Sequence, residues 1–215
     1  MPGGADLGYC RVLNGDGTRV ISDYVRRGGA YLGFCAGGYY GARRCEFEVG
    51  DPALEVIGSR ELGFFPGTCR GAAFKGFAYH SESGARAVRL AVPEKALGPT
   101  FMEPVVVSYY NGGGIFVAGD DAVEGDVEVL ASYADEVDVD GGKDKAAVVY
   151  CKVGDGAAIL TGPHPEYVYI DISGIVSMLT NTGSPPSTYT HSQTSPATTS
   201  SDTPLPRMRD RGPTS

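Results

Sequence analysis

The stretch Gly33-Phe34-Cys35-Ala36-Gly37 places a thiol between two glycines, directly after the apolar residues 30–34. A nucleophile elbow carries its reactive side chain on a sharp strand-to-helix turn, which needs small neighbours because the two backbones pass closely. A helix N-terminus after Cys35 would lower the pKa of the thiol, and the backbone N–H of Ala36 would point toward a forming oxyanion. The pattern predicts a nucleophile; the alternative is a small buried hydrophobic residue.

A cysteine nucleophile generally needs a base, and the base needs a group that orients it. His164 lies between two prolines after the apolar residues 157–160, and Glu166 follows two positions later. In an extended segment the two side chains share a face, so Glu166 could accept the imidazole N–H. We predict His164 as the base; the alternative is a turn histidine packed between prolines. His80 is interpreted as a surface residue or a substrate contact.

Composition limits the classes of partner. The chain has 215 residues, 42% of them hydrophobic and 20% charged, with a net charge of −8, which suits a globular protein. It has no cluster of Lys and Arg and no apolar run near the ~20 residues that span a bilayer, so we expect neither nucleic-acid nor membrane partners. The five cysteines form no CxxC pair, and the residues indicate neither a metal nor a cofactor. We expect reduced thiols in the cytoplasm.

Local patterns predict a mixed α/β fold. Val20, Tyr24 and Val25 recur at helical spacing, which predicts a helix over 18–27 that stops at the following glycine pair. A second helix is expected over 36–44. Apolar runs predict strands at 30–34, 105–110, 115–119 and 127–133, and on both sides of residues 154–156.

Glycine-rich segments between these runs predict turns. Residues 111–114 (Asn-Gly-Gly-Gly) and 154–156 (Gly-Asp-Gly) are typical of β-hairpins, although the first could instead bring its backbone close to a ligand. We expect a mostly parallel central sheet flanked by helices, with antiparallel hairpins in its C-terminal half. Cys35 should then open toward His164 at the carboxyl ends of strands.

The chain is expected to hold one domain over residues 1–181 and a disordered tail over 182–215. The tail is rich in Ser, Thr and Pro and poor in aliphatic residues, so it cannot bury enough apolar surface to offset the entropy of ordering. At the other end, Pro2-Gly3-Gly4-Ala5-Asp6 is a turn that would normally follow a strand. One or more initial strands are therefore expected to be missing.

The Gly-x-Cys-x-Gly-Gly pattern at 33–38, followed by His-Pro-Glu at 164–166, resembles the class I glutamine amidotransferases. Their triad is Cys, His and Glu in this order, on a flavodoxin-like fold. The resemblance implies that Cys35, His164 and Glu166 form the triad. It also implies that residues 2–6 are the oxyanion loop, with the N–H groups of Gly4 and Ala36 as donors. The implied reaction is amide hydrolysis through a thioester, with glutamine as the usual small substrate.

A narrower resemblance covers about residues 2–175. Its motifs are PGGAD, GGAYLGFCAGGYYG, SRELGFFPG, GARAV and YYNGGG. Together they are similar to the N-terminal amidotransferase-like region of fungal-type biotin–protein ligases, in which a ligase domain would be the partner. The ligase module, with its Gly/Arg-rich adenylate loop and lysine, has no counterpart in this sequence, so biotin transfer is not expected from this chain alone. The alternative function is a regulatory or interaction module that kept the triad residues and lost turnover.

Overall fold

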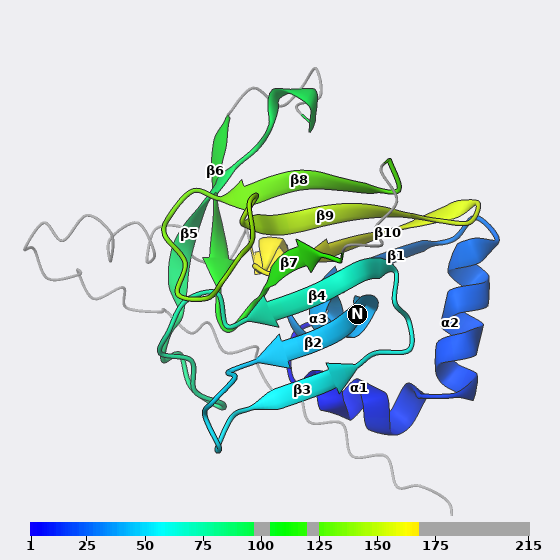
Figure 1. Ribbon diagram of the computed structural model, residues 1–215, viewed down its shortest axis with the longest axis horizontal. Coiled ribbons are helices and arrows are strands. Elements are labelled where there is room, and N and C mark those ends of the chain that lie inside the picture. Colours follow the sequence, from blue (N-terminus) through cyan, green and yellow to red (C-terminus); the bar gives the residue numbers. More distant parts are fainter. Residues whose placement is uncertain (97–103, 120–124, 168–215) are drawn as a thin grey trace, which may run out of the picture. The chain divides into compact units, whose positions relative to one another are not determined.

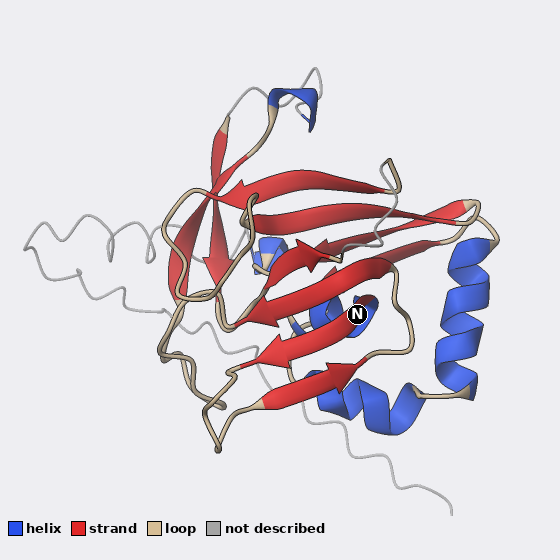
Figure 2. Cartoon of the chain, in the orientation of Figure 1, coloured by secondary structure: helices blue, strands red, loops and turns tan. Residues whose placement is uncertain are grey.

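The computed structural model describes residues 1–96, 104–119 and 125–167 (Figures 1 and 2). Its helices are α1 (Asp6–Leu13), α2 (Asp16–Arg26) and α3 (Ala36–Gly41), with 3₁₀ turns at Glu94–Ala96 and Pro165–Tyr167. The strands are β1 (Ala30–Phe34), β2 (Ala42–Phe47), β3 (Val56–Ser59), β4 (Phe65–Gly71), β5 (Arg86–Ala91), β6 (Val105–Tyr110), β7 (Ile115–Ala118), β8 (Val127–Tyr133), β9 (Ala146–Val153) and β10 (Gly156–Thr161).

All these strands belong to one large sheet, in the order β3-β2-β4-β7-β9-β8-β5-β6, and β10 joins β9 to β1. Within the described ranges, parallel pairing is limited to β1 with β10 and β2 with β4. Every other pair of these strands is antiparallel. The mixed α/β prediction is confirmed, but the prediction of a mostly parallel sheet is wrong.

The lack of crossover helices within the described ranges agrees with the mostly antiparallel pairing. A parallel pair needs a crossover of about a dozen residues or more, commonly a helix, whereas a short turn produces an antiparallel pair. After α3, the described part of the chain contains only the short 3₁₀ turns as helical segments. The turn between β9 and β10 is formed by Gly154 and Asp155, and Gly154 has a φ of 62°, which favours glycine. This hairpin was predicted correctly.

The second predicted hairpin is wrong. β6 and β7 flank residues 111–114 as expected, but β6 pairs with β5, and β7 pairs with β4 and β9. Instead, the glycines allow two chain segments to lie in close contact. A Cβ atom on Gly113 would lie 1.9 Å from the carbonyl oxygen of Gly162, after β10. The segment therefore crosses the end of β10 before the chain enters β7.

Two of the helices pack on the part of the sheet that holds β1 and β10. α2 contacts β1 and β10, and α3 contacts β1, β2, β4 and β10. The helix predicted over 18–27 is confirmed as α2, but Val20 and Tyr24 are 66% and 57% exposed, while Val25 is fully buried. The helix predicted over 36–44 ends at Gly41, because residues 42–47 form β2.

Two apolar clusters fill the interior. The larger one joins α3 to the sheet, and its most buried members include Val25, Tyr40, Phe65, Val149 and Leu160. The smaller one lies between β5, β6, β7 and β8, around Val88, Tyr110, Ile115 and Tyr133. Cys151 is fully buried, as predicted for a core cysteine.

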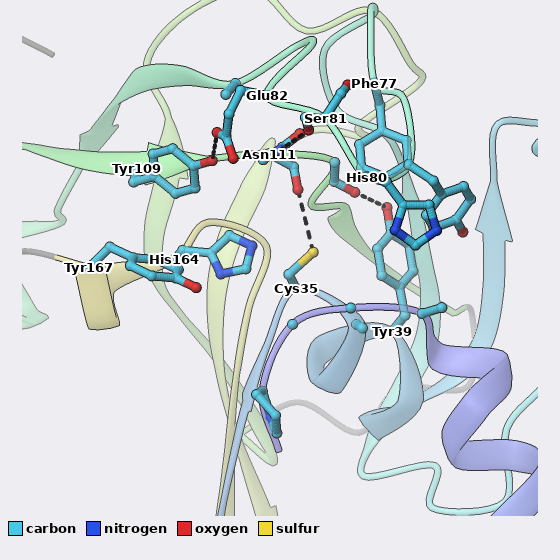
Figure 3. Close-up of a pocket in the computed structure, with 18 of the residues that line it drawn as sticks. Cys35, Tyr39, Phe77, His80, Ser81, Glu82, Tyr109, Asn111, His164 and Tyr167 are labelled. Carbon is cyan, nitrogen blue, oxygen red and sulfur yellow. Dashed lines mark hydrogen bonds between the residues drawn. The ribbon is translucent and has the colours of Figure 1, made fainter.

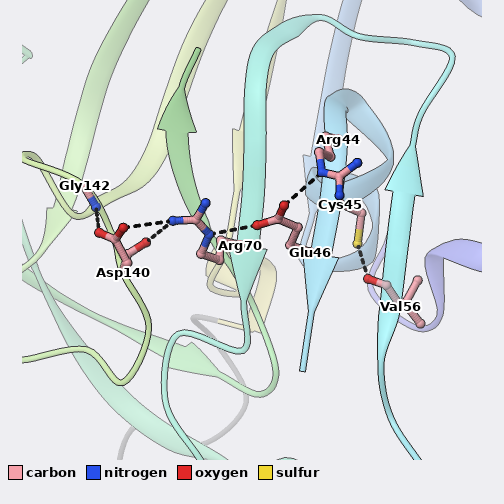
Figure 4. A network of polar contacts seen from close by, with 7 residues as sticks. All are labelled: Arg44, Cys45, Glu46, Val56, Arg70, Asp140 and Gly142. Atoms are coloured by element: carbon pink, nitrogen blue, oxygen red, sulfur yellow. Dashed lines mark hydrogen bonds and ion pairs between the residues drawn. The ribbon is translucent and has the colours of Figure 1, made fainter. Parts of the chain in front are cut away.

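Strand alternation separates charged from apolar side chains on β2 (Figure 4). Glu46 accepts hydrogen bonds from Arg44 (2.9 Å) and from Arg70 on β4 (3.0 Å), and Arg70 also binds the Asp140 carbonyl at 2.9 Å. The Arg44 hydrogen bond, and then that of Arg70, lower the pKa of Glu46. Cys45, between Arg44 and Glu46, is fully buried.

The predicted tail, residues 182–215, and the domain boundary at 181 lie outside the described residues. Among the residues that the structure describes, no helix is both long and apolar enough to cross a membrane.

Candidate functional site

Cys35 lies on a strained turn between β1 and α3. Its φ of 47° and ψ of −103° fall in a region that non-glycine residues rarely adopt, and such strain clusters at functional sites. The flanking glycines are required by close backbone contacts. A Cβ on Gly33 would lie 2.5 Å from the carbonyl oxygen of Gly37, and a Cβ on Gly37 would lie 2.3 Å from that of Met1. The turn is tight, as the glycine spacing indicated, and its role as a nucleophile elbow stays a prediction.

The thiol of Cys35 is held in its protonated form. Burial raises its pKa to about 12, and the N–H groups of Ala36 and Gly4 offset part of this effect. The direction is opposite to the lowered pKa expected from the sequence, because burial outweighs the local N–H groups. The sulfur donates a hydrogen bond to the Asn111 carbonyl at 3.6 Å, rather than to a side-chain base. A nucleophilic role would therefore require a base that removes this proton.

His164 and Glu166 form a hydrogen-bonded pair, and both residues line the same cleft as Cys35. Figure 3 shows the imidazole of His164 beside Cys35. Nδ1 of His164 lies 2.8 Å from Oε1 of Glu166, and the side chains are 9% and 30% exposed. The backbone N–H of His164 binds the Tyr109 carbonyl at 2.8 Å, which fixes the segment after β10 to the end of β6. Glu166 reaches the ring from the 3₁₀ turn Pro165–Tyr167, not from the extended segment that the sequence suggested.

Residues 1–6 bring further backbone groups to the cleft. Phe34 and Met1 share a backbone hydrogen bond of 3.0 Å, so the chain start runs beside β1. A Cβ on Gly3 would lie 2.5 Å from Cε1 of His164, which places this glycine against the imidazole. The expectation of a missing initial strand stays a prediction.

A buried ion pair anchors this loop. The carboxylate of Asp6, the first residue of α1, accepts a hydrogen bond from Nε of Arg60 at 2.6 Å, and the two side chains are 9% and 3% exposed. Arg60 in turn donates to the carbonyls of Gly58 and Ser59 at 3.0 Å. The pair thus ties residues 2–6, which carry the Gly4 N–H, to the end of β3.

Cys35, Ala36, Gly4, His164 and Glu166 all line one cleft of about 1210 Å³. Several other lining residues come from distant segments, and for residues 111–114 the sequence indicated only that the backbone could approach a ligand. Asn111 is the clearest of these: its Nδ2 donates to the Ser81 carbonyl at 3.3 Å, while its Oδ1 is buried with no hydrogen-bond partner in the described part of the chain. Tyr109 donates to the Glu82 carboxylate beside it. His80 also lines the cleft and is exposed.

The arrangement has the parts of a covalent acyl-transfer site. It combines a thiol on a strained turn, an imidazole oriented by a carboxylate, and two backbone N–H groups close to the sulfur. A carboxylate that accepts Nδ1–H leaves Nε2 as the ring nitrogen that can take a proton.

Comparison with known proteins identifies similar sequences. A family model described as "Biotin-protein ligase, N terminal" matches residues 1–192. The biotin–protein ligase of Schizosaccharomyces pombe is 46% identical over 167 residues, which are 78% of this chain and 25% of that protein. An uncharacterized protein of Chlamydia muridarum is 40% identical over 169 residues, which are 78% of this chain and 60% of that protein. The chain thus spans about a quarter of the yeast relative and three fifths of the chlamydial one.

Solved structures are more distant. A PurLQS structure from Thermotoga maritima is 16% identical, covers 80% of this chain and 72% of its own, and has a TM-score of 0.46. A β-galactosidase from Bacillus circulans sp. alkalophilus is 14% identical, covers 77% and 21%, and has a TM-score of 0.42. Likenesses at this level carry no functional inference.

Proposed function

Because the chain belongs to the family of biotin–protein ligase N-terminal domains, we propose that it is an amidotransferase-like domain that hydrolyses a carboxamide through a thioester on Cys35. The observation that carries the proposal is the meeting of the strained Cys35 turn and the His164–Glu166 pair in one cleft. In this proposal the domain works beside a ligase module in longer relatives.

The reaction begins when Nε2 of His164 takes the proton of the Cys35 thiol and the sulfur attacks the amide carbon. A C–S bond forms, and the N–H groups of Gly4 and Ala36 hold the oxyanion. The C–N bond then breaks, and His164 returns its proton to the departing nitrogen. Water, deprotonated by His164, cleaves the C–S bond of the thioester and regenerates the thiol. The net change is amide plus water to carboxylic acid plus amine.

One feature supports a carboxamide substrate. The side-chain Oδ1 of Asn111 is buried and has no hydrogen-bond donor among the described residues. The N–H of a carboxamide would supply this donor. The site is next to the Cys35 sulfur, which binds the backbone carbonyl of Asn111. Glutamine is one such carboxamide.

Alkylation by chloroacetamide tests the proposal, because this reagent carries both a carboxamide and a carbon that a thiolate can attack. We expect Cys35 to react faster than Cys10, the half-buried internal standard, and at a pH far below the raised pKa of its thiol, because His164 removes the proton. In His164→Ala the rate should rise only toward the pKa of the buried thiol, at about 12. Equal profiles in the two proteins would contradict base-assisted activation. Ammonia release from glutamine, with Cys35→Ser as the control, tests turnover.

A regulatory module without turnover is the second candidate. The observation that favours it is the resting thiol, which is protonated and donates to Asn111 rather than to His164. This candidate predicts slow alkylation of Cys35, no dependence on His164, and no amide hydrolysis.

A further inference from the structure

The cleft is much larger than the space that a carboxamide group and the carbon atoms next to it would fill. Its volume of about 1210 Å³ exceeds the ~300–1,000 Å³ that is common for drug-sized ligands. The cleft therefore has room for another part of the substrate beyond the sulfur, and the residues that line this space indicate the chemistry that would fit.

One side of the cleft is an aromatic wall, formed by Phe47 at the end of β2 and by Phe77 and Tyr79 in the loop before β5. The Phe47 and Phe77 ring centroids are 5.4 Å apart, and those of Phe77 and Tyr79 are 4.9 Å apart, both edge to face. A Cβ on Gly112 would lie 2.5 Å from the Phe77 ring, so this ring also packs on the backbone next to Asn111. The wall is thus held in place from several directions.

Phe77, a member of this wall, lies across Cys35 from the imidazole. In Figure 3, Cys35 stands between His164 and Tyr109 on one side and Phe77 and His80 on the other. Glu82 hydrogen-bonds to Tyr109, so this carboxylate belongs to the His164 side. If His164 protonates the departing nitrogen, the nitrogen lies on its side of the sulfur. The acyl chain then extends in the opposite direction, toward the aromatic wall.

We propose that the aromatic wall is the acyl subsite, and that the preferred substrate is an amide of an apolar acyl group, such as an aryl-alkanoyl or alkanoyl chain. This inference rests on the proposed amide hydrolysis and specifies its substrate class. An apolar chain gains free energy when it covers aromatic surface, and the Tyr79 side chain is 39% exposed. The charged amino-acid head of glutamine would instead lose hydration against these rings.

The alternative is that the three rings only pack the loop of residues 72–85. Loop packing predicts that truncating a ring lowers stability without changing which reagents Cys35 prefers. An acyl subsite predicts that the preference itself changes. Relative reactivity therefore separates the two explanations, even if a variant is less stable than the parent protein.

Three chloromethyl ketones test the proposal: the sulfur displaces chloride from each, so a C–S bond forms and the C–Cl bond breaks. They share one electrophile and differ in the attached group, which is methyl, phenylethyl or the amino-acid head of glutamine. We expect the phenylethyl reagent to alkylate Cys35 at least about tenfold faster than the methyl reagent, since burial of a ring is worth that factor or more. The glutamine-like reagent should alkylate Cys35 no faster than the methyl reagent does.

Phe77→Ala should bring the phenylethyl-to-methyl ratio close to one, and Tyr79→Ala, at the more exposed ring, should lower it with less risk to folding. Tyr167→Ala removes a lining ring on the His164 side and should leave the ratio unchanged. A ratio near one in the parent protein, or fastest labelling by the glutamine-like reagent, would overturn the subsite. Alkylation needs no turnover, so an observed ratio without amide hydrolysis would refute the proposed function while the subsite stands.

Discussion

Gly3 offers a perturbation of His164 that changes no charge and no catalytic group. An alanine Cβ at this position would lie 2.5 Å from Cε1 of His164, whereas ordinary contacts lie at 3.4–4 Å. The imidazole would therefore have to retreat by roughly 1 Å from its place beside Glu166. Gly3, unlike Gly4, is outside the left-handed backbone region, so the substitution adds no strain of its own. Misplacement of a catalytic group by 1 Å can cost about a hundredfold in rate.

We expect Gly3→Ala to lower the His164-dependent alkylation of Cys35 by chloroacetamide by about a hundredfold at neutral pH. The rate is read by mass spectrometry, with Cys10 as the internal standard. Gly8→Ala is the matched control, because a Cβ at this exposed position meets nothing within 4 Å. A rate equal to that of the parent protein in Gly3→Ala would refute the inference that the imidazole works from the position it occupies against Gly3.

Three other changes have expected outcomes. Glu166→Gln should lower the same rate by about a hundredfold or more, since an amide can stabilise the wrong tautomer of His164; an unchanged pH profile would argue against this. Asp6→Ala leaves Arg60 buried without its carboxylate and should cost about 3–5 kcal/mol in urea unfolding; a loss under 1 kcal/mol would show that the pair contributes little. Burial raises the pKa of Cys151 from 9.0 to about 12. The free energy of unfolding that this protonated thiol contributes is present below pH 9 and should fall by on the order of 4 kcal/mol as the pH rises toward 12. The fall should be smaller in Cys151→Val.

Much of the site's local chemistry could be predicted from short stretches. The glycines around Cys35 indicated a tight turn, and the backbone contacts at Gly33 and Gly37 have the closeness that such a turn needs. The pairing of His164 with Glu166 was predicted because only one residue separates them. The loop of Gly3 and the segment of Asn111 were each indicated, but their contacts with His164 and Cys35 were not, and the aromatic wall was missed. These contacts depend on how distant segments meet. The protonated state of Cys35 was missed for the same reason, because the burial that sets its pKa comes from the whole cleft.

The fold shows the same division. Strands at 30–34, 105–110 and 127–133 were predicted with the observed bounds, because apolar runs and turn residues mark them locally. The direction and partners of the strands were not. Residues 111–114 have the composition of a hairpin turn, yet they join two strands that pair elsewhere, because Gly113 packs against Gly162 from another part of the chain.

The sequence by itself determined the chemical groups and their immediate backbone: a thiol on a glycine-flanked turn, an imidazole with a carboxylate two residues away, and the family to which both belong. The tertiary structure decided that these groups share one cleft, that the thiol is buried and its pKa raised, and that Phe77 lies across the cleft from the imidazole. The physical reason is the distance along the chain over which each property is set. Local backbone conformation depends on neighbouring residues, whereas burial, pKa and the shape of a cleft depend on distant segments that only folding brings together.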